Sequence, residues 1–294
     1  MSSYPDPKPE FALDIGRLAG LAVWRLGKGV YRFDDAFAQA VDSSKFGDEI
    51  PPELLFNLPE WGVYVVGPFT EARSFDVKGF FAHLEWDVGA GRPELRILWD
   101  LDDTEANPWL LPQPIYLDRP LLQGAAAVFE NSHAAMVGGI ENPDEPGNPA
   151  LHDPKSLDEL TSLAKVAIVR LLALVVDEPD ISDVNRPDNQ PTPAKPHKRG
   201  RWFGAPGTQT WNVGYRIGTA LRTRLDTMPG DNQTNPNRRA SPRPHVRAAH
   251  FRVYWTGPGR TTPTLRWIKP SLIGAGELPI TERPVNQSDN TTSP

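Results

Sequence analysis

Side chains that can bind phosphate and planar groups gather near the carboxyl-terminal end of the chain. They are Arg238, Arg239, Arg243, His245, Arg247, His250, Arg252, Tyr254 and Arg266. A guanidinium group can form two parallel hydrogen bonds with a phosphate, and a flat ring can stack on an unpaired base. The same side chains could instead bind an acidic polypeptide or pair with carboxylates of the chain itself. The pattern predicts an anionic ligand but leaves these alternatives open.

The distribution of charge supports a basic surface. From Lys195 to Lys269 there are fifteen Lys and Arg but only two acids, Asp226 and Asp231, a local formal net charge of +13 within a chain of −6. The low overall pI of about 5.6 therefore hides a basic carboxyl-terminal region. Such a region attracts nucleic acid or acidic polypeptides, and it could also dock on the acidic remainder of the chain.

Catalysis and metal binding are indicated only by weak patterns. His245 could act as a general base in RNA cleavage, and the carboxylates of 100–103 could bind Mg²⁺ or cap a turn. His250 follows His245 by five residues, which places the two on opposite faces of a strand and argues against a shared ion. The chain has no phosphate loop, dinucleotide fingerprint, nucleophile elbow or zinc-protease motif. We expect no metal and no cofactor, and a binding protein more than an enzyme.

Four tryptophans fall within or beside the strands expected between residues 61 and 117. They are Trp61, Trp86, Trp99 and Trp109. Large aromatic side chains on one sheet either fill its core or, where part of the cluster is exposed, line a groove for a peptide. Both interpretations remain open at this point. His83 lies among apolar neighbours and is expected to be half-buried and hydrogen-bonded.

Hydrophobic periodicity predicts the secondary structure. Helical spacing or composition occurs in 11–45, which reads as two helices, in 120–136, and in 157–176 with Ser156 as its N-cap. Alternation predicts strands at 61–66, 80–86, 95–101 and 211–225, with a Pro-containing edge strand at 112–117.

Two hairpins are expected. In the first, 80–86 pairs with 95–101 and places Glu85 opposite Arg96. In the second, 249–256 pairs with 264–268 through the turn 257–260, with Trp255 facing Leu265 and Val253 facing Trp267. Phe251 would join these apolar residues on the core face, which leaves the basic residues on the other face.

These elements predict an α+β protein with a mainly antiparallel sheet covered by helices and connected by long Pro/Gly-rich loops. The sheet would consist of the 61–117 strands, extended by those of 211–268. The expected regions are an acidic α+β region at 10–176, a Pro-rich linker or excursion at 177–200, a basic β-rich region at 201–275 and a disordered tail at 277–294, which could form one body.

The sequence suggests a reducing, cytoplasmic location. There is no cysteine, and the first ten residues are polar and Pro-rich, unlike a signal peptide. The longest apolar stretch, Val166–Val176, is interrupted by Arg170 and is too short to span a bilayer.

Several blocks together resemble the second-described family of type V-A anti-CRISPR proteins. The blocks are 58–65 (LPEWGVYV), 79–87 (GFFAHLEWD), 94–98 (ELRIL), 241–250 (SPRPHVRAAH) and 265–270 (LRWIKP). The resemblance implies an inhibitor carried by phages or plasmids. It also implies recognition of a segment of the type V effector nuclease as that polypeptide is made, with loss of its messenger RNA. The expected partners are therefore a nascent chain and, through it, an mRNA or ribosome.

Two other functions remain open from the residues alone. One is a stand-alone RNA- or DNA-binding protein, which could be a nuclease, that uses the basic carboxyl-terminal region. The other is a structural or assembly protein of a phage.

Overall fold

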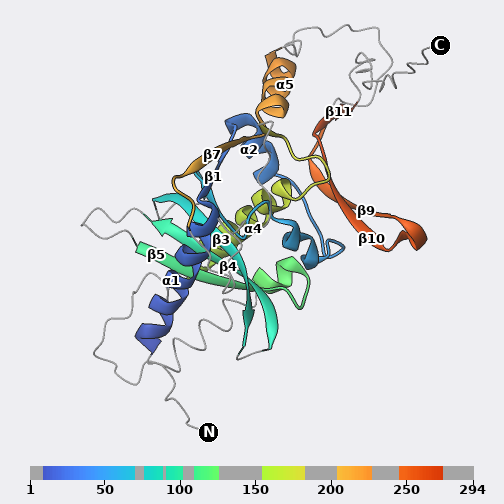
Figure 1. Ribbon diagram of the computed structural model, residues 1–294. Coiled ribbons are helices and arrows are strands. Elements are labelled where there is room, and N and C mark those ends of the chain that lie inside the picture. Colours follow the sequence, from blue (N-terminus) through green and yellow to red (C-terminus); the bar gives the residue numbers. More distant parts are fainter. Residues whose placement is uncertain are drawn as a thin grey trace, which may run out of the picture.

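A seven-stranded sheet forms the centre of the computed structural model, which describes residues 9–69, 76–88, 91–101, 109–125, 154–182, 204–226 and 245–273 (Figure 1). Its strands are β1 (Gly29–Phe33), β2 (Gly62–Val66), β3 (Val77–Asp87), β4 (Arg92–Leu101), β5 (Trp109–Tyr116), β6 (Ile181–Ser182) and β7 (Gln209–Val213). Their order is β5-β4-β3-β2-β1-β7-β6. Only β1 pairs in parallel, with β2 and with β7. The expected α+β class with a mainly antiparallel sheet is confirmed.

Helices cover both faces of the sheet. The helices of the body are α1 (Pro9–Gly27), α2 (Asp35–Asp42) and α4 (Pro154–Leu174), with a 3₁₀ turn η1 (Pro52–Asn57). A further helix, α5 (Tyr215–Asp226), contacts α2 and projects from the body (Figure 1). The first helix, α1, crosses β2 to β5 (Figure 1). It comes so close that a Cβ on Gly62 would lie 2.8 Å from the backbone nitrogen of Trp24. In α4 every residue from Val166 to Leu174 is buried, as expected for a helix that is apolar almost all round.

Sequence periodicity misassigned two segments. The strand β1 was not expected, because its five residues follow a helix directly and are held as a strand by pairing on both sides. The strand expected at 211–225 ends at Val213, and α5 begins at Tyr215. Gly214 lies between them with φ +76°, a conformation that glycine tolerates best, and it turns the chain into the helix.

Both hairpins form, but each is shifted by two residues from the expected pairing. In β3–β4 the residue opposite Arg96 is His83, and Glu85 faces Glu94. The strands continue to Asp87 and Arg92, so the connecting loop is shorter than expected. In the second hairpin Val253 faces Leu265 and Trp255 faces Pro263. A shift of two residues keeps each side chain on its expected face, because side chains alternate with a period of two.

The second hairpin does not extend the central sheet. It consists of β9 (His250–Thr256), the turn η3 (Pro258–Arg260) and β10 (Thr262–Ile268). The pair β8 (His245–Arg247) and β11 (Ser271–Ile273) lies beyond the open end of the hairpin, opposite the turn. These strands form two separate two-stranded sheets. Among the described residues of the 211–268 segment, only those of β7 join the central sheet, so the expectation that the final hairpin extends this sheet was wrong.

The remaining expectations are met in part. The edge strand at 112–117 is confirmed as β5, at the end of the sheet. The helix α4 begins at Pro154, so Ser156 lies inside its first turn and is not the N-cap. Residues 126–136 of the Ala-rich segment, 183–200 of the Pro-rich segment and the tail 277–294 lie outside the described residues. Within the described ranges, no helix is both long and apolar enough to cross a membrane.

Candidate interface of the basic ribbon and the adjoining cleft

Strands β8 to β11, residues 245–273, form a narrow structure that projects from the body and is called here the basic ribbon (Figure 1). This stretch contains no Asp or Glu. Its cationic residues are Arg247, Arg252, Arg260, Arg266 and Lys269. The positive region expected from the sequence therefore includes a distinct structural unit.

The inner face of the ribbon attaches it to the body. Phe251 and Leu265 are buried there, as expected for the core face. Nε1 of Trp267 donates to Oγ of Ser44 over 2.9 Å, and its ring meets that of Phe37 edge-on at 5.1 Å. The backbone of Lys45 exchanges hydrogen bonds of 3.1 and 3.0 Å with the ribbon.

Trp255 was expected in the same core face, but its residue is 53% exposed. Alternation along β9 places it on the inner side with Phe251, but it lies one residue before the end of the strand, close to the turn η3. Figure 1 shows this end of the ribbon projecting from the body. Alternation along the strand predicted its side correctly, but alternation cannot say how far the body extends beneath that side.

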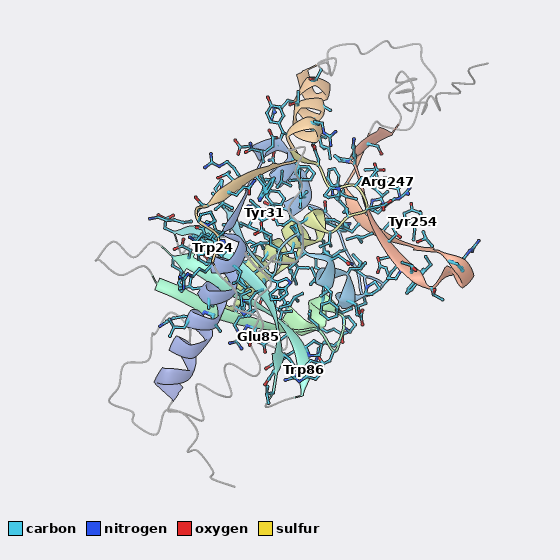
Figure 2. The ribbon with its side chains drawn as sticks, in the orientation of Figure 1. Trp24, Tyr31, Glu85, Trp86, Arg247 and Tyr254 are labelled. Carbon is cyan, nitrogen blue, oxygen red and sulfur yellow. The ribbon has the colours of Figure 1, made fainter. Side chains whose placement is uncertain are left out.

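The outer face of the ribbon brings several predicted site residues together. Arg252 and Arg266 lie directly opposite each other. Their guanidinium carbons lie 5.2 and 5.4 Å from the ring centroid of Tyr254. Arg266 also contacts Asp177 at 3.4 Å in an exposed ion pair, whereas no carboxylate of the described residues pairs with Arg252. Figure 2 labels Tyr254 and the exposed Arg247 on the same ribbon.

The other predicted basic residues contribute less to the described site. His250 is half-buried, and its backbone lies beside Lys45. His245 lies in β8, but its side chain is outside the description, and so are Arg238, Arg239 and Arg243. Among the described residues, no group of three potential metal ligands occurs.

A cleft of about 570 Å³ lies beside the base of the ribbon, where the end of α4, the start of α5 and the end of β10 meet. Its apolar lining comes from Phe37, Ala173, Val176, Pro179, Ile217, Trp267 and Ile268. Its acidic lining, Asp177, Glu178 and Asp180, follows the end of α4. Its basic lining consists of Arg216 at the start of α5 and of Arg266 and Lys269 at the end of β10. The cleft therefore combines an apolar surface with charges of both signs.

Asp180 connects the segment after α4 to the start of α5 within the cleft. Its buried carboxylate accepts a hydrogen bond from Nε of Arg216 over 2.7 Å and one from the backbone nitrogen of Ile217 over 3.0 Å. A carboxylate in this position satisfies an unpaired N–H at the start of α5. Sequence reasoning missed these cleft residues. The acidic run Asp177–Asp180 directly after a buried helix was the available signal.

A second polar group lies on the sheet under α1. Nε2 of His83 lies 2.9 Å from Oε2 of Glu85, and Nη2 of Arg96 contacts Glu85 at 2.7 Å and Glu94 at 2.5 Å. Burial raises the pKa of Glu94 to about 7, against the opposing charge of Arg96. Burial also disfavours ionised Glu85, but the hydrogen bond with His83 and the charge of Arg96 outweigh it and lower its pKa.

The two innermost members of this network are too enclosed to contact a substrate. Glu94 is 2% exposed and His83 is 1% exposed, so His83 is more buried than expected. Its Nδ1 atom has no hydrogen-bond partner, and a Cβ on Gly20 of α1 would lie 3.3 Å from it. The network therefore contributes to the packing of α1 on the sheet.

The acidic strand end expected to bind Mg²⁺ or cap a turn is described only at Asp100. Its carboxylate accepts a hydrogen bond of 2.7 Å from the hydroxyl of Tyr64. Burial and this carboxylate raise the pKa of Tyr64. Asp102 and Asp103 lie outside the described residues.

The tryptophans proposed for a peptide groove are in different environments. Trp99 is fully buried, its Nε1 donates to Gln113 over 2.6 Å, and its ring packs against Phe80, so it belongs to the core. Trp61 and Trp86 are exposed, and Figure 2 labels Trp86 near the end of β3. The side chain of Trp109 is outside the description. None of the three whose side chains are described lines the cleft beside the ribbon.

Comparison with known proteins assigns the chain to a family. The model of the AcrVA2-like family, described as the anti-CRISPR type V subtype A2 family, matches residues 31–275. The chain belongs to this family. An anti-CRISPR inhibitor is therefore the functional class of this AcrVA2-like protein, and the resemblance seen in its sequence blocks is confirmed.

Two relatives extend this comparison. The AcrVA2-like chain is 24% identical over 290 residues to Protein FinQ of Escherichia coli. The alignment covers 90% of this chain and 79% of FinQ. It also matches the crystal structure of AcrVA2 with a TM-score of 0.55 and 21% identity, over 89% of this chain and 77% of that one. The second likeness shows a shared fold.

Proposed function

We propose that this AcrVA2-like protein binds the nascent chain of a type V effector nuclease and lowers the expression of that nuclease through its mRNA. The observation that carries the proposal is the family match over residues 31–275. The gene would reside on a phage or plasmid, and the protein would act in the cytoplasm of the host bacterium, where the effector is translated.

The cleft beside the ribbon supports binding of a polypeptide. Its volume of about 570 Å³ lies within the usual range for binding sites and can hold a few side chains. Its apolar residues could bury one or two apolar side chains of the target. Asp177 and Glu178 on one wall and Arg216 and Lys269 on the other could then pair with flanking charges.

The experiment uses a bacterium that carries a type V system. Expression of the intact AcrVA2-like protein should lower both the effector protein and its mRNA, and affinity capture should enrich the nascent effector chain with its ribosomes. Ile217→Arg places a charge on the apolar part of the cleft, which opposes burial of an apolar side chain of the target. The level of effector protein should therefore be at least about tenfold higher with this variant than with the wild-type inhibitor.

The matched control is Ala220→Arg. It adds the same charge to the same helix at an exposed position outside the cleft, and repression should be retained. Capture without enrichment of effector peptides would contradict the proposed target. Repression that survives Ile217→Arg would exclude the cleft while leaving the target intact.

A further inference from the structure

We propose that the basic ribbon binds single-stranded nucleic acid. Arg252 and Arg266 would contact phosphates on its outer face, and Tyr254 and Trp255 would stack with bases near its projecting end. This goes beyond the proposed function, because it assigns a second class of ligand to a second surface and does not depend on which polypeptide is the target.

The first argument is an uncompensated positive charge. Arg252 and Arg266 face each other across the two strands, and like charges in this position destabilise a β-pair. The ribbon contains no acid of its own. Among the described residues the only carboxylate that forms an ion pair with either arginine is Asp177, 3.4 Å from Arg266, and both of these side chains are about half exposed. An exposed ion pair of this kind is weak, so an incoming anion can replace it.

The second argument is the orientation of the guanidinium groups. Both lie close to the ring of Tyr254, at 5.2 and 5.4 Å, and contacts of this kind hold an arginine by its attraction to the aromatic face. The two cations are therefore held side by side before any ligand binds. Paired guanidinium groups fit the oxygens of phosphates, which they can bind with two hydrogen bonds each.

The third argument favours unpaired nucleic acid over other anions. Trp255 is 53% exposed at the projecting end of the ribbon, next to Tyr254. A flat exposed ring adds affinity for a base but adds little for a carboxylate. Bases inside a duplex are stacked on each other and cannot use it. Because the ribbon is only two strands wide, a flexible single strand can reach both of its faces near the end.

The test measures binding of the full chain to a fluorescein-labelled 20-nucleotide oligouridine by anisotropy, between 50 and 200 mM KCl. The logarithm of the binding constant falls linearly with the logarithm of the salt concentration, and each phosphate contact to a single strand steepens the slope of this fall by about 0.7. The variant Arg252→Gln/Arg266→Gln should therefore reduce that slope by about 1.4. Trp255→Ala should weaken binding about tenfold at every salt concentration and leave the slope unchanged, because stacking releases no counterions.

The matched control is Arg32→Gln/Lys165→Gln, which removes the same charge from exposed positions on β1 and α4. It should keep the wild-type slope. Three results would overturn the proposal: no binding at 50 mM KCl, an unchanged slope in the ribbon variant, or tighter binding to a duplex of the same length. Displacement of the oligonucleotide by an equal charge concentration of polyglutamate would also overturn it, in favour of an acidic polypeptide.

A second measurement does not require the variants to fold. Cross-linking of the wild-type protein to an oligouridine that contains 4-thiouridine, followed by mass spectrometry, should place cross-links within residues 245–273. Cross-links confined to other elements would reject the ribbon as the site. Since neither measurement involves the effector nuclease, failure here leaves the proposed function to its own test.

Discussion

The guanidinium of Arg170 forms two hydrogen bonds with the carboxylate of Asp42, from Nε to Oδ1 over 2.9 Å and from Nη2 to Oδ2 over 2.8 Å. Arg170 comes from α4 and Asp42 ends α2. The same guanidinium donates to the carbonyls of Val66 and Pro68 and lies 4.3 Å from the ring centroid of Phe69. One buried side chain thus connects two helices with the end of β2.

Arg170→Met should therefore lower the free energy of unfolding by about 3–5 kcal/mol, measured by urea denaturation. The substitution keeps most of the side-chain volume but removes the guanidinium that pairs with Asp42 and donates to two carbonyls. Lys165→Met, at an exposed position of the same helix, should change stability by less than about 0.5 kcal/mol. The double variant Asp42→Leu/Arg170→Met should lose less than the sum of its single variants. A loss below about 1 kcal/mol for Arg170→Met would show that the pair contributes little.

Glu94 should make stability depend on pH. Burial raises its pKa from an ordinary 4.5 to about 7, so the folded chain binds more protons than the unfolded chain between these values. The stabilising contribution of protonated Glu94 is complete below about pH 4.5 and is lost as the pH rises through about 7. The lowered pKa of Glu85 acts below pH 4.5 and does not offset this loss.

The comparison of wild type with Glu94→Gln between pH 5 and 8 isolates this effect. Glutamine stays neutral, so the variant should gain on the order of 2 kcal/mol relative to wild type as the pH rises. Because the two carboxyl groups interact, the midpoint belongs to the Glu85–Glu94 pair. Asp118→Asn, at a carboxyl whose pKa is lowered by a hydrogen bond from Arg119, should leave the profile parallel to wild type. A constant difference between wild type and Glu94→Gln over this range would refute the assignment.

Gly214 should not tolerate a side chain. Its φ is +76°, and a Cβ added there would lie 1.9 Å from the ring of Phe37. Gly214→Ala should therefore lower the free energy of unfolding by roughly 1–3 kcal/mol, because it combines backbone strain with a clash. Gly207→Ala is the matched control, because a Cβ at Gly207 would meet no atom within 4 Å. Equal urea midpoints for the two variants would mean that the turn adapts at no cost.

The features of the fold that depend on residues close together in the sequence could be predicted. The apolar run within α4 and the alternation along β3 and β4 each reflect one buried surface, so local spacing indicates the element and the side that faces the core. The same holds for the ribbon, where alternation separated Phe251 from Arg252. Register could not be predicted in this way, because a shift of two residues preserves the alternation. Residue composition also indicated the positive region, since charge is carried by residue type.

Contacts between distant segments depended on the tertiary structure. The pairing of Arg170 with Asp42 spans 128 positions, and nothing near either residue indicates the other. Trp99 and Trp86 look alike in the sequence, yet one is fully buried and the other is 60% exposed, because only Trp99 lies where the core covers the sheet. The sequence alone thus determined which residues are apolar or charged and where apolar and polar residues alternate. Chain packing decided which of them remain accessible, because burial depends on what the rest of the chain places above each side chain.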